Sequence, residues 1–281
     1  MPHAPTIREA LETARQATDR IEARVLLREV LKRTDAYMRA HDDEPLTAEQ
    51  ARQYVELVVR RVAGEPIAYI TGRREFYGRE FSVAPAVLIP RPETELLVEL
   101  ALQRLPADAP CRVLDLGAGS GCIGISIAAE RPQAQVTLLD VSESALEIAR
   151  VNAAQWAPHN TRLLRSDWFG SVSGNRFDLI VSNPPYVADG DAHLAQGDLR
   201  FEPRTALAAG TDGLRDLRRI IARAPQHLQP CAWLLLEHGF DQAAACGQLL
   251  TAAGLEDVFN ARDLAGVPRA SGGRMKGEHD R

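Results

Sequence analysis

The chain has 281 residues, of which 45% are hydrophobic, so it is long enough to bury a full core and form one large domain with a smaller one. Its net charge is −5 and its arginines are interspersed with acidic residues, which gives no chain-wide footprint for duplex nucleic acid. No apolar run approaches the roughly 20 residues that span a bilayer, and the N-terminus lacks the pattern of a signal peptide, so we expect a cytoplasmic protein without membrane association.

The four cysteines lie far apart in the sequence, and none has a histidine neighbour at ligand spacing. They form no CxxC pair, which argues against a zinc site and against a disulfide framework. We therefore predict no metal, and we expect all four to lie in the core: Cys111, Cys122, Cys231 and Cys246. The group from His41 to Glu44 also carries metal-binding atoms, but we interpret it as a solvated loop.

Apolar residues recur at helical spacing from Ile7 to about Val62, which predicts a small helical bundle over residues 1–72. The sequence also contains helix start and stop signals. These are N-caps at Thr6 and Asp19, a capping box at Thr47 with Gln50, and a stop at Gly64 with Pro66. The predicted helices therefore have local start or stop signals in the sequence.

The pattern changes to short extended runs after the bundle. Glu75-Phe76-Tyr77 and Glu80-Phe81-Ser82-Val83 are separated by Gly78-Arg79, which predicts a β-hairpin. We interpret residues 73–90 as a linker between domains. The segment Arg91 to Glu95 then opens a helix through about Arg104, with proline in its first turn and acidic residues at the positive end of the helix dipole.

Strand-like and helix-like segments alternate over residues 91–281. Such alternation predicts a doubly wound α/β domain with a parallel sheet that helices cover on both faces. The predicted strands are Arg112 to Leu116, Gln135 to Asp140, Thr161 to Leu164, Asp178 to Ser182, Ala232 to Leu236 and Leu255 to Asn260. The predicted helices are one after Gly121, Ser144 to Ala154, Leu214 to Ala224 and Gln242 to Ala253.

A glycine-rich loop follows the first of these strands, with residues Gly117, Ala118, Gly119, Ser120 and Gly121. Glycines at alternate positions allow a tight turn and let a ligand lie against bare backbone at a helix N-terminus. We expect an adenosine-type cofactor there. A structural turn without a ligand is the alternative, since such loops recur without one.

Two acidic residues bear on which cofactor this is. Asp140 closes the next strand, where a carboxylate accepts hydrogen bonds from both ribose hydroxyls. Glycine spacing alone leaves a dinucleotide open, because Gly119, Gly121 and Gly124 satisfy the GxGxxG pattern. Asp115, before the loop, favours S-adenosylmethionine, because it can meet the methionine ammonium group directly or through water.

Ser166-Asp167-Trp168 follows the third strand of this domain. In such a fold we expect Asp167 to meet the adenine amino group and Trp168 to cover the ring by stacking. The alternative is a surface aspartate beside a tryptophan that only packs.

Asn183-Pro184-Pro185-Tyr186 follows the strand that ends at Ser182, at the sheet edge where ligands bind. The prolines stiffen this loop. The Asn183 side chain and the Pro184 carbonyl can accept both hydrogens of a planar NH2 group, while Tyr186 stacks on its plane. Held this way, the nitrogen can attack a sulfonium methyl group by positioning and electrostatics, without a separate base. Glu237 and His238 end a strand on the same edge, and we interpret them as structural.

Together these segments resemble the HemK/PrmC family, the glutamine-N5 methyltransferases of peptide chain release factors. The matching segments are Gly64 to Gly72, Phe76-Tyr77-Gly78, Leu88 to Glu95, the glycine loop, Ser166 to Trp168, Ser182 to Tyr186, Arg200 to Pro203 and Asp212 to Leu214. Asn-Pro-Pro-Tyr is shared with DNA and RNA amino methyltransferases, whereas Ile-Pro-Arg-Pro-Glu-Thr-Glu is more specific.

The resemblance implies a seven-stranded Rossmann-like methyltransferase domain, acting on the glutamine of the Gly-Gly-Gln loop in class I release factors. It implies that the bundle helps to engage this protein substrate and that S-adenosylhomocysteine is the product. We also expect a monomer without direct nucleic-acid contact. It also implies cofactor contacts by the glycine loop, Asp140, Trp168 and Asn183, and substrate contacts by Asn183 to Tyr186, Arg91 and Glu93.

One segment departs from the family pattern. Leu264 to Arg274 stands where the family has a β-rich final strand, and Pro268 with Gly272 and Gly273 makes that strand doubtful. We therefore expect a frayed sheet edge and a polar tail from Ser271 to Arg281. The alternative function is an adenine or cytosine amino methyltransferase, which the acidic balance and the lack of an inserted basic, aromatic-rich segment disfavour. A non-catalytic binding protein is the other alternative.

Overall fold

The computed structural model describes residues 4–277, and the chain forms two compact units. Unit 1 comprises Met1–Gly72 and Gly197–Phe201, and unit 2 comprises Arg73–Gln196 and Glu202–Arg281. Within the described residues, no helix is long and apolar enough to cross a membrane.

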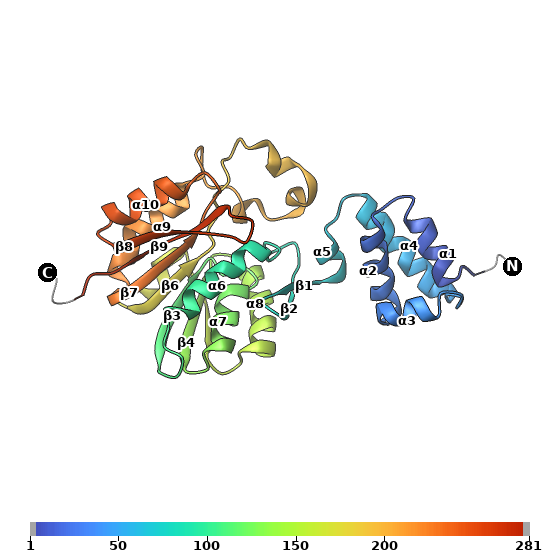
Figure 1. Cartoon of the computed structure of the whole chain (residues 1–281), viewed down its shortest axis with the longest axis horizontal. Helices are drawn as coiled ribbons and strands as arrows, with labels where there is room; N and C mark the ends of the chain where they lie inside the picture. Colours follow the sequence, from blue (N-terminus) through green and yellow to red (C-terminus); the bar gives the residue numbers. More distant parts are fainter. Residues whose placement is uncertain (1–3, 278–281) are drawn as a thin grey trace. The chain divides into compact units, whose positions relative to one another are not determined.

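Unit 1 is helical (Figure 1). Its helices are α1 (Ile7–Ala14), α2 (Arg20–Leu31), α3 (Asp35–Ala40), α4 (Ala48–Val62) and α5 (Ile67–Thr71). The predicted caps are confirmed: the side chains of Thr6, Asp19 and Thr47 each accept a backbone N–H, and Gln50 completes the capping box. Helices α3 and α5 were not predicted, because helices of six and five residues are too short to show a period.

The core of unit 1 is a cluster of apolar side chains from all five helices and the loop before α4. Tyr54 of α4 is buried there and donates a hydrogen bond of 3.0 Å from its hydroxyl to the Ala23 carbonyl. Three valines of α4 face outward instead, at the i, i+4 and i+7 spacing of one helix face: Val55, Val59 and Val62. Unit 1 therefore has a hydrophobic core of its own, and the three valines form an exposed apolar stripe on α4.

Unit 2 begins with the predicted hairpin, β1 (Arg73–Phe76) and β2 (Arg79–Ser82). Tyr77 and Gly78 at the turn both have positive φ, as a two-residue hairpin turn requires. Asn152 of α8 (Glu143–Trp156) accepts a hydrogen bond of 2.7 Å from the Ser82 amide and donates one of 2.9 Å to the Ser120 carbonyl. This buried amide joins the hairpin to the glycine loop.

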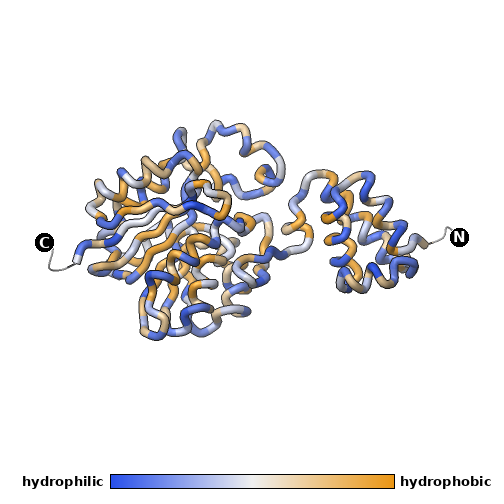
Figure 2. Tube along the Cα trace, in the orientation of Figure 1, coloured by the Kyte–Doolittle hydropathy of each residue, from blue (hydrophilic) through white to orange (hydrophobic). Residues whose placement is uncertain are grey.

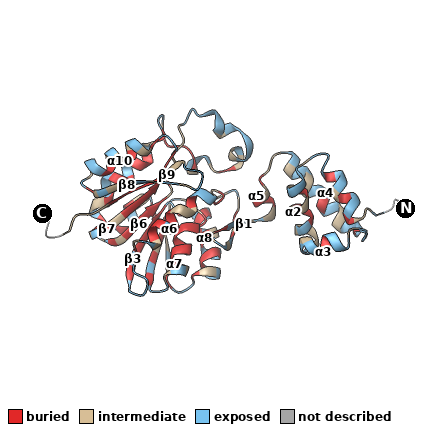
Figure 3. Ribbon diagram, viewed as in Figure 1, coloured by how far each residue is buried: buried red, intermediate tan, exposed pale blue. Residues whose placement is uncertain are grey.

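A seven-stranded sheet forms the centre of unit 2, as predicted, in the order β5-β4-β3-β6-β7-β9-β8. The strands are β3 (Cys111–Leu116), β4 (Ala134–Asp140), β5 (Thr161–Arg165), β6 (Phe177–Ser182), β7 (Leu228–Glu237), β8 (Glu256–Arg262) and β9 (Pro268–Arg274). The first five in this order are parallel, whereas β9 runs antiparallel to both of its neighbours. The central strands are hydrophobic (Figure 2) and buried (Figure 3), because both faces are covered.

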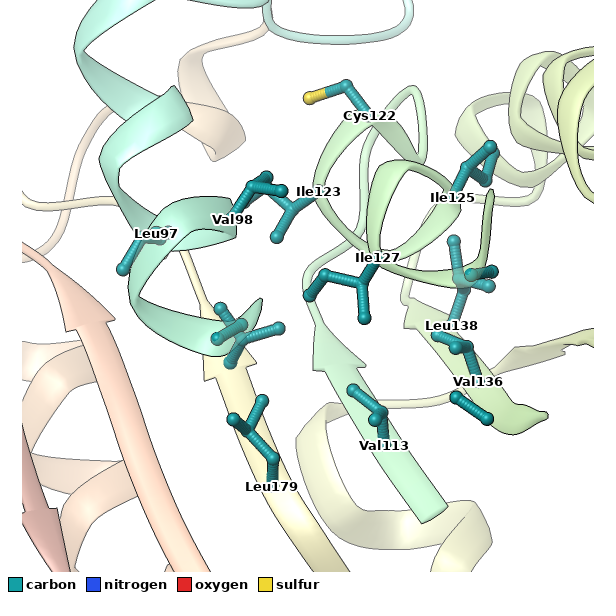
Figure 4. Packing of buried hydrophobic residues seen from close by; sticks show 14 of the residues in the cluster. Leu97, Val98, Val113, Cys122, Ile123, Ile125, Ile127, Val136, Leu138 and Leu179 are labelled. Carbon is teal, nitrogen blue, oxygen red and sulfur yellow. The ribbon is translucent and has the colours of Figure 1, made fainter. Parts of the chain in front are cut away.

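Helices cover both faces of this sheet. The helices are α6 (Glu95–Leu102), α7 (Cys122–Glu130), α8 (Glu143–Trp156), α9 (Arg215–Arg223) and α10 (Ala243–Ala252). Figure 4 shows α6 and α7 over one face, where Leu97 and Ile127 belong to one buried cluster with Val113 and Leu179. Leu114 points to the other face, where α9 and α10 pack. Neighbouring residues of β3 therefore enter different cores, which fixes the register of the strand.

The expectation of a frayed final strand is wrong. β9 is formed, and it lies inside the sheet between β7 and β8. Pro268 is its first residue, where a missing N–H is tolerated. A Cβ on Gly272 would lie 2.6 Å from Phe259 Cε1 and 2.8 Å from Leu235 Cδ2, so a larger residue would force those side chains to shift. Of the predicted polar tail, residues 278–281 lie outside the described residues.

The expectation for the cysteines is wrong at one position. Cys111, Cys122 and Cys246 are buried as predicted, but Cys231 in β7 is exposed. Its backbone has φ of 64°, so the strand is irregular there. Within residues 4–277, no group of His, Cys, Asp or Glu is arranged to hold a metal ion.

Candidate active site

The strand order reverses between β3 and β6, which is where open α/β sheets bind ligands. Leu116 of β3 pairs with Ser182 of β6, and the Ser182 hydroxyl donates a buried hydrogen bond of 2.7 Å to the Leu116 carbonyl. The segments that begin at Gly117 and at Asn183 therefore leave the sheet side by side.

The glycine loop needs its glycines for conformation and for space. Gly117, Gly119 and Gly121 have φ of 70°, 57° and 81°, in the left-handed region that favours glycine. The Gly117 amide donates a hydrogen bond of 2.8 Å to the Leu139 carbonyl, which ties the loop to β4. A Cβ on Gly117 would lie 3.3 Å from the Trp168 ring. The bare backbone therefore leaves a cradle beside the indole.

Asp140 at the end of β4 holds this loop. Its Oδ2 accepts a hydrogen bond of 2.9 Å from the Gly119 amide, and its Oδ1 accepts one of 2.8 Å from the Ser142 amide. Each carboxylate oxygen has a further lone pair. The side chain is thus fixed in orientation and still able to accept hydrogen bonds from a diol.

A cavity of about 380 Å³ lies over these loops. It brings together ten of the residues predicted for the site: Arg91, Gly117, Ala118, Gly119, Ser120, Asp140, Asp167, Trp168, Asn183 and Pro185. Five others do not line its wall: Glu93, Asp115, Gly121, Pro184 and Tyr186. The wall also includes Pro85 to Leu88, which the sequence pattern identified only as linker.

Trp168 has an unusual backbone for a large side chain, with φ of 49°. The Ser166 hydroxyl donates a hydrogen bond of 2.7 Å to the Trp168 carbonyl and accepts one of 2.9 Å from the Ser171 amide, which holds this conformation. Asp167 is exposed and pairs with Arg219 at 3.0 Å. The strained backbone places the indole on the cavity wall.

Asp115 lies below the glycine loop, buried and away from the wall. Its Oδ2 accepts a hydrogen bond of 2.9 Å from the Gly124 amide, and its Oδ1 has no hydrogen-bond partner among the described residues. Burial raises the pKa of this carboxyl to about 7. The free oxygen is an acceptor that a polar ligand group or a bridging water can satisfy.

The Asn183 to Tyr186 loop is anchored on both sides. The Asn183 side-chain amide donates a hydrogen bond of 3.2 Å to the Thr94 hydroxyl, and the Tyr186 hydroxyl donates one of 3.2 Å to Glu237 Oε1. The Tyr186 carbonyl accepts one of 3.0 Å from the Gln242 side chain. Burial and the neighbouring Glu237 raise the pKa of Tyr186, so its phenol stays protonated.

Arg91 and Glu202 form an ion pair beside the cavity, and the Glu202 side chain is fully buried. The second carboxylate oxygen of Glu202 accepts a hydrogen bond of 3.1 Å from the Ile89 amide. Sequence reasoning named Arg91 but gave no role to Thr94 or Glu202. Both lie within segments that resemble the family, Leu88 to Glu95 and Arg200 to Pro203. The resemblance therefore marked these segments, but the sequence did not indicate which side chains they contact.

His238 is structural, as interpreted from the sequence. Its ring is fully buried, with Nε2 2.7 Å from the Ser271 hydroxyl and Nδ1 2.8 Å from the Gly239 carbonyl. Glu237 differs from this interpretation, because it contacts the Asn183 to Tyr186 loop through Tyr186.

Comparison with known proteins identifies the family. Residues 6–72 match the PrmC N-terminal domain, and residues 94–202 match the methyltransferase small domain. The chain is 52% identical over 267 residues to a release factor glutamine methyltransferase of Burkholderia pseudomallei (strain K96243), covering 92% of this chain and 93% of that protein. The chain belongs to the release factor glutamine methyltransferase family. The Escherichia coli (strain K12) protein of that name is 43% identical over 275 residues, or 98% of this chain and 99% of that one.

Solved structures agree on the fold of this family member. A 16S rRNA N2 G1207 methyltransferase from T. Thermophilus has a TM-score of 0.54 at 19% identity, covering 73% of this chain and 50% of that chain. As a member of the release factor glutamine methyltransferase family, the protein is a methyltransferase whose cofactor is S-adenosylmethionine. The residues fit that cofactor, because the cradle at Gly117, the Asp140 carboxylate and the free Asp115 oxygen suit an aromatic base, a diol and an ammonium group.

Proposed function

We propose that this enzyme transfers a methyl group from S-adenosylmethionine to the side-chain amide nitrogen, N5, of the glutamine in the Gly-Gly-Gln loop of class I release factors. The observation that carries the proposal is that Asn183 and the glycine loop begin side by side and line one cavity. The names of relatives that match 92% and 98% of the chain support the release factor as substrate.

The cofactor is held by residues of three loops in this proposal. Gly117 to Gly121 give the backbone surface, Asp140 accepts hydrogen bonds from the ribose hydroxyls, and Trp168 covers the adenine. Asp167 meets the adenine amino group, and Asp115 meets the methionine ammonium group through water, since it lies behind the wall. When bound, S-adenosylmethionine supplies an electrophilic methyl group on a positively charged sulfur.

The substrate amide is held by the Asn183 to Tyr186 loop. Asn183 Oδ1 and the Pro184 carbonyl accept the two hydrogens of the glutamine NH2 group, and Tyr186 packs against its plane. These two acceptors orient the nitrogen toward the methyl group, so the residues contribute positioning and electrostatic stabilisation. Arg91 and Glu93 contact the release factor beside the cavity.

Unit 1 helps to engage the release factor in this proposal. The exposed valine stripe of α4 supports this role, because a contiguous apolar helix face suits a protein partner. We further propose a monomeric enzyme that acts in the cytoplasm without direct nucleic-acid contact, a view that the net charge of −5 supports.

The test is a methyl-transfer assay with radiolabelled S-adenosylmethionine, offering a release factor and nucleic acid side by side. We expect label on the release factor, and none when the glutamine of its Gly-Gly-Gln loop is replaced. Label on nucleic acid alone would overturn the proposal in favour of an amino methyltransferase of bases, and label on neither would favour a binding protein.

Asn183→Ala tests the amide clamp in the same assay. Loss of one preorganised acceptor lowers kcat by about a hundredfold or more, while calorimetry shows cofactor binding largely retained. Asn175→Ala is the matched control. Asn175 lies before the first residue of β6, whereas Asn183 follows the last residue of the same strand, at the end where the cavity lies. Unchanged turnover in Asn183→Ala would remove the clamp from the mechanism.

A further inference from the structure

Two buried side chains, Thr94 and Glu237, connect Asn183 to Tyr186. Asn183 donates to the Thr94 hydroxyl at 3.2 Å, the Thr94 side chain lies against Glu237 and favours its charged form, and Tyr186 donates to Glu237 at 3.2 Å. Thr94 and Glu237 are each 2% exposed. The path joins the segment before α6, the end of β7 and the loop after β6.

The chemistry of a carboxylate sets the direction of this path. An ionised Glu237 accepts hydrogen bonds and donates none, and its buried Oε2 has no hydrogen-bond partner within residues 4–277, so this oxygen is open to a donor. The Thr94 hydroxyl has one hydrogen, which is left over once its oxygen has accepted the Asn183 N–H. A hydroxyl that donates to Glu237 can face Asn183 only with a lone pair. Asn183 must then turn its Nδ2 toward Thr94.

We propose that Thr94 and Glu237 are positioning residues that fix the orientation of the Asn183 amide, so that its Oδ1, rather than its Nδ2, meets the substrate NH2 group. This inference rests on the proposed function and deepens it. An Asn183 amide turned over would present N–H hydrogens to the hydrogens of the substrate amide, which repel each other. The acceptor role of Asn183 therefore depends on Thr94, which lines the cavity, and on Glu237, which lies behind the wall.

The surroundings of Glu237 make the orientation of the Asn183 amide sensitive to pH. Burial raises the pKa of the Glu237 carboxyl to about 7, against the stabilising effects of Thr94, Tyr186 and Arg269. Glu93 and, from α7, Cys122 also face this group, and Arg91 faces its partner Tyr186. A protonated Glu237 can donate a hydrogen bond, so it no longer forces the direction of the Thr94 hydroxyl. Turnover should therefore fall as the pH drops through about 7.

Thr94→Val tests the inference because it keeps the shape of the side chain and removes the hydroxyl. We expect kcat on the release factor to fall by about tenfold or more, with the dissociation constant of S-adenosylmethionine changed by less than about twofold. Thr94→Ser restores the hydroxyl and should recover most of the activity. Thr161→Val is the matched control, because the Thr161 hydroxyl bonds the Ala157 carbonyl at the start of β5.

Two measurements do not depend on turnover alone. The side-chain NH2 signals of Asn183 in a nitrogen-15 NMR spectrum, assigned by their loss in Asn183→Ala, should shift in Thr94→Val and return in Thr94→Ser. Glu237→Gln should flatten the acidic side of the kcat profile, since a glutamine does not titrate and can face Thr94 as donor or acceptor.

Unchanged kcat in a folded Thr94→Val, a Thr94→Ser as slow as Thr94→Val, or an acidic limb that persists in Glu237→Gln each overturns the inference. If Thr94→Val does not fold, the Glu237→Gln profile decides. Failure of the proposed function is separate, because the wild-type enzyme would then leave the release factor unlabelled.

Discussion

Gly272→Ala tests the packing that makes β9 an interior strand. A Cβ at this position would lie 2.6 Å from Phe259 Cε1 and 2.8 Å from Leu235 Cδ2, which is closer than real Cβ contacts. Relieving such overlap shifts side chains and backbone, and overpacking of this kind costs about 1–3 kcal/mol. Since 1 kcal/mol moves the Tm of a domain of this size by roughly 2–4 °C, we expect a fall of about 2–12 °C.

The assay is thermal and urea unfolding followed by circular dichroism, with Gly190→Ala as the matched control. Gly190 has open space where its Cβ would stand and no positive φ, so alanine is accommodated without strain. We expect Gly190→Ala to equal the wild type or exceed it by up to about 1 kcal/mol, through the reduced entropy of the unfolded chain.

A Gly272→Ala variant as stable as Gly190→Ala would refute the reasoning. The paired glycines would then have no steric role, and the formation of β9 would need another explanation. Loss of stability with a lower urea midpoint and an unchanged slope is the expected pattern, because the extent of surface exposed on unfolding stays the same.

Three further predictions follow from the site and from unit 1. Asp140→Ala should weaken S-adenosylmethionine binding by about tenfold or more in calorimetry, because it removes charge-assisted hydrogen bonds to the diol; unchanged affinity would contradict the ribose role. Val59→Ser, at a residue 60% exposed on α4, should raise KM for the release factor and leave cofactor affinity alone, and an unchanged KM would argue against substrate engagement by this stripe. The Asp115 pKa is about 7 in the folded state against 3.8 as the ordinary value, so its stabilising contribution is complete below pH 3.8 and is lost as the pH rises to about 7; Asp115→Asn should lose less stability than the wild type across that window in urea unfolding.

The sequence predicted the parts of the fold that local pattern encodes. Alternating apolar segments marked β3 to β8, and the caps at Thr6, Asp19 and Thr47 marked three helix starts. It was less informative where tertiary packing overrides propensity. Gly272 and Gly273 are poor strand formers, but Leu235 and Phe259 fill the space beside Gly272, and Leu255 and Val258 fill the space beside Gly273.

In the site, too, the sequence predicted residues that a local pattern marks and missed residues that only tertiary packing brings together. The glycine loop and Asn183 were identified because each follows a strand, and the carboxyl ends of parallel strands share one edge. The cavity wall from Pro85 to Leu88 was missed, since no local pattern tells which face of the sheet edge a linker crosses. Likewise, nothing in the spacing of Arg91 and Glu202 indicates that they pair across more than a hundred residues.

Thr94 illustrates why such residues escape a sequence-based assignment and still matter for chemistry. From the sequence it was only part of the segment that opens a helix. In the structure its hydroxyl accepts no backbone N–H of α6 and instead accepts a hydrogen bond from Asn183. A threonine that only capped the helix would be replaceable by any good cap, including aspartate. A threonine that orients Asn183 through Glu237 requires a hydroxyl that donates a hydrogen bond to Glu237 and accepts one from Asn183. The rate of Thr94→Ser against that of Thr94→Asp therefore separates the two roles, because aspartate is a good capping residue but adds a second carboxylate beside Glu237.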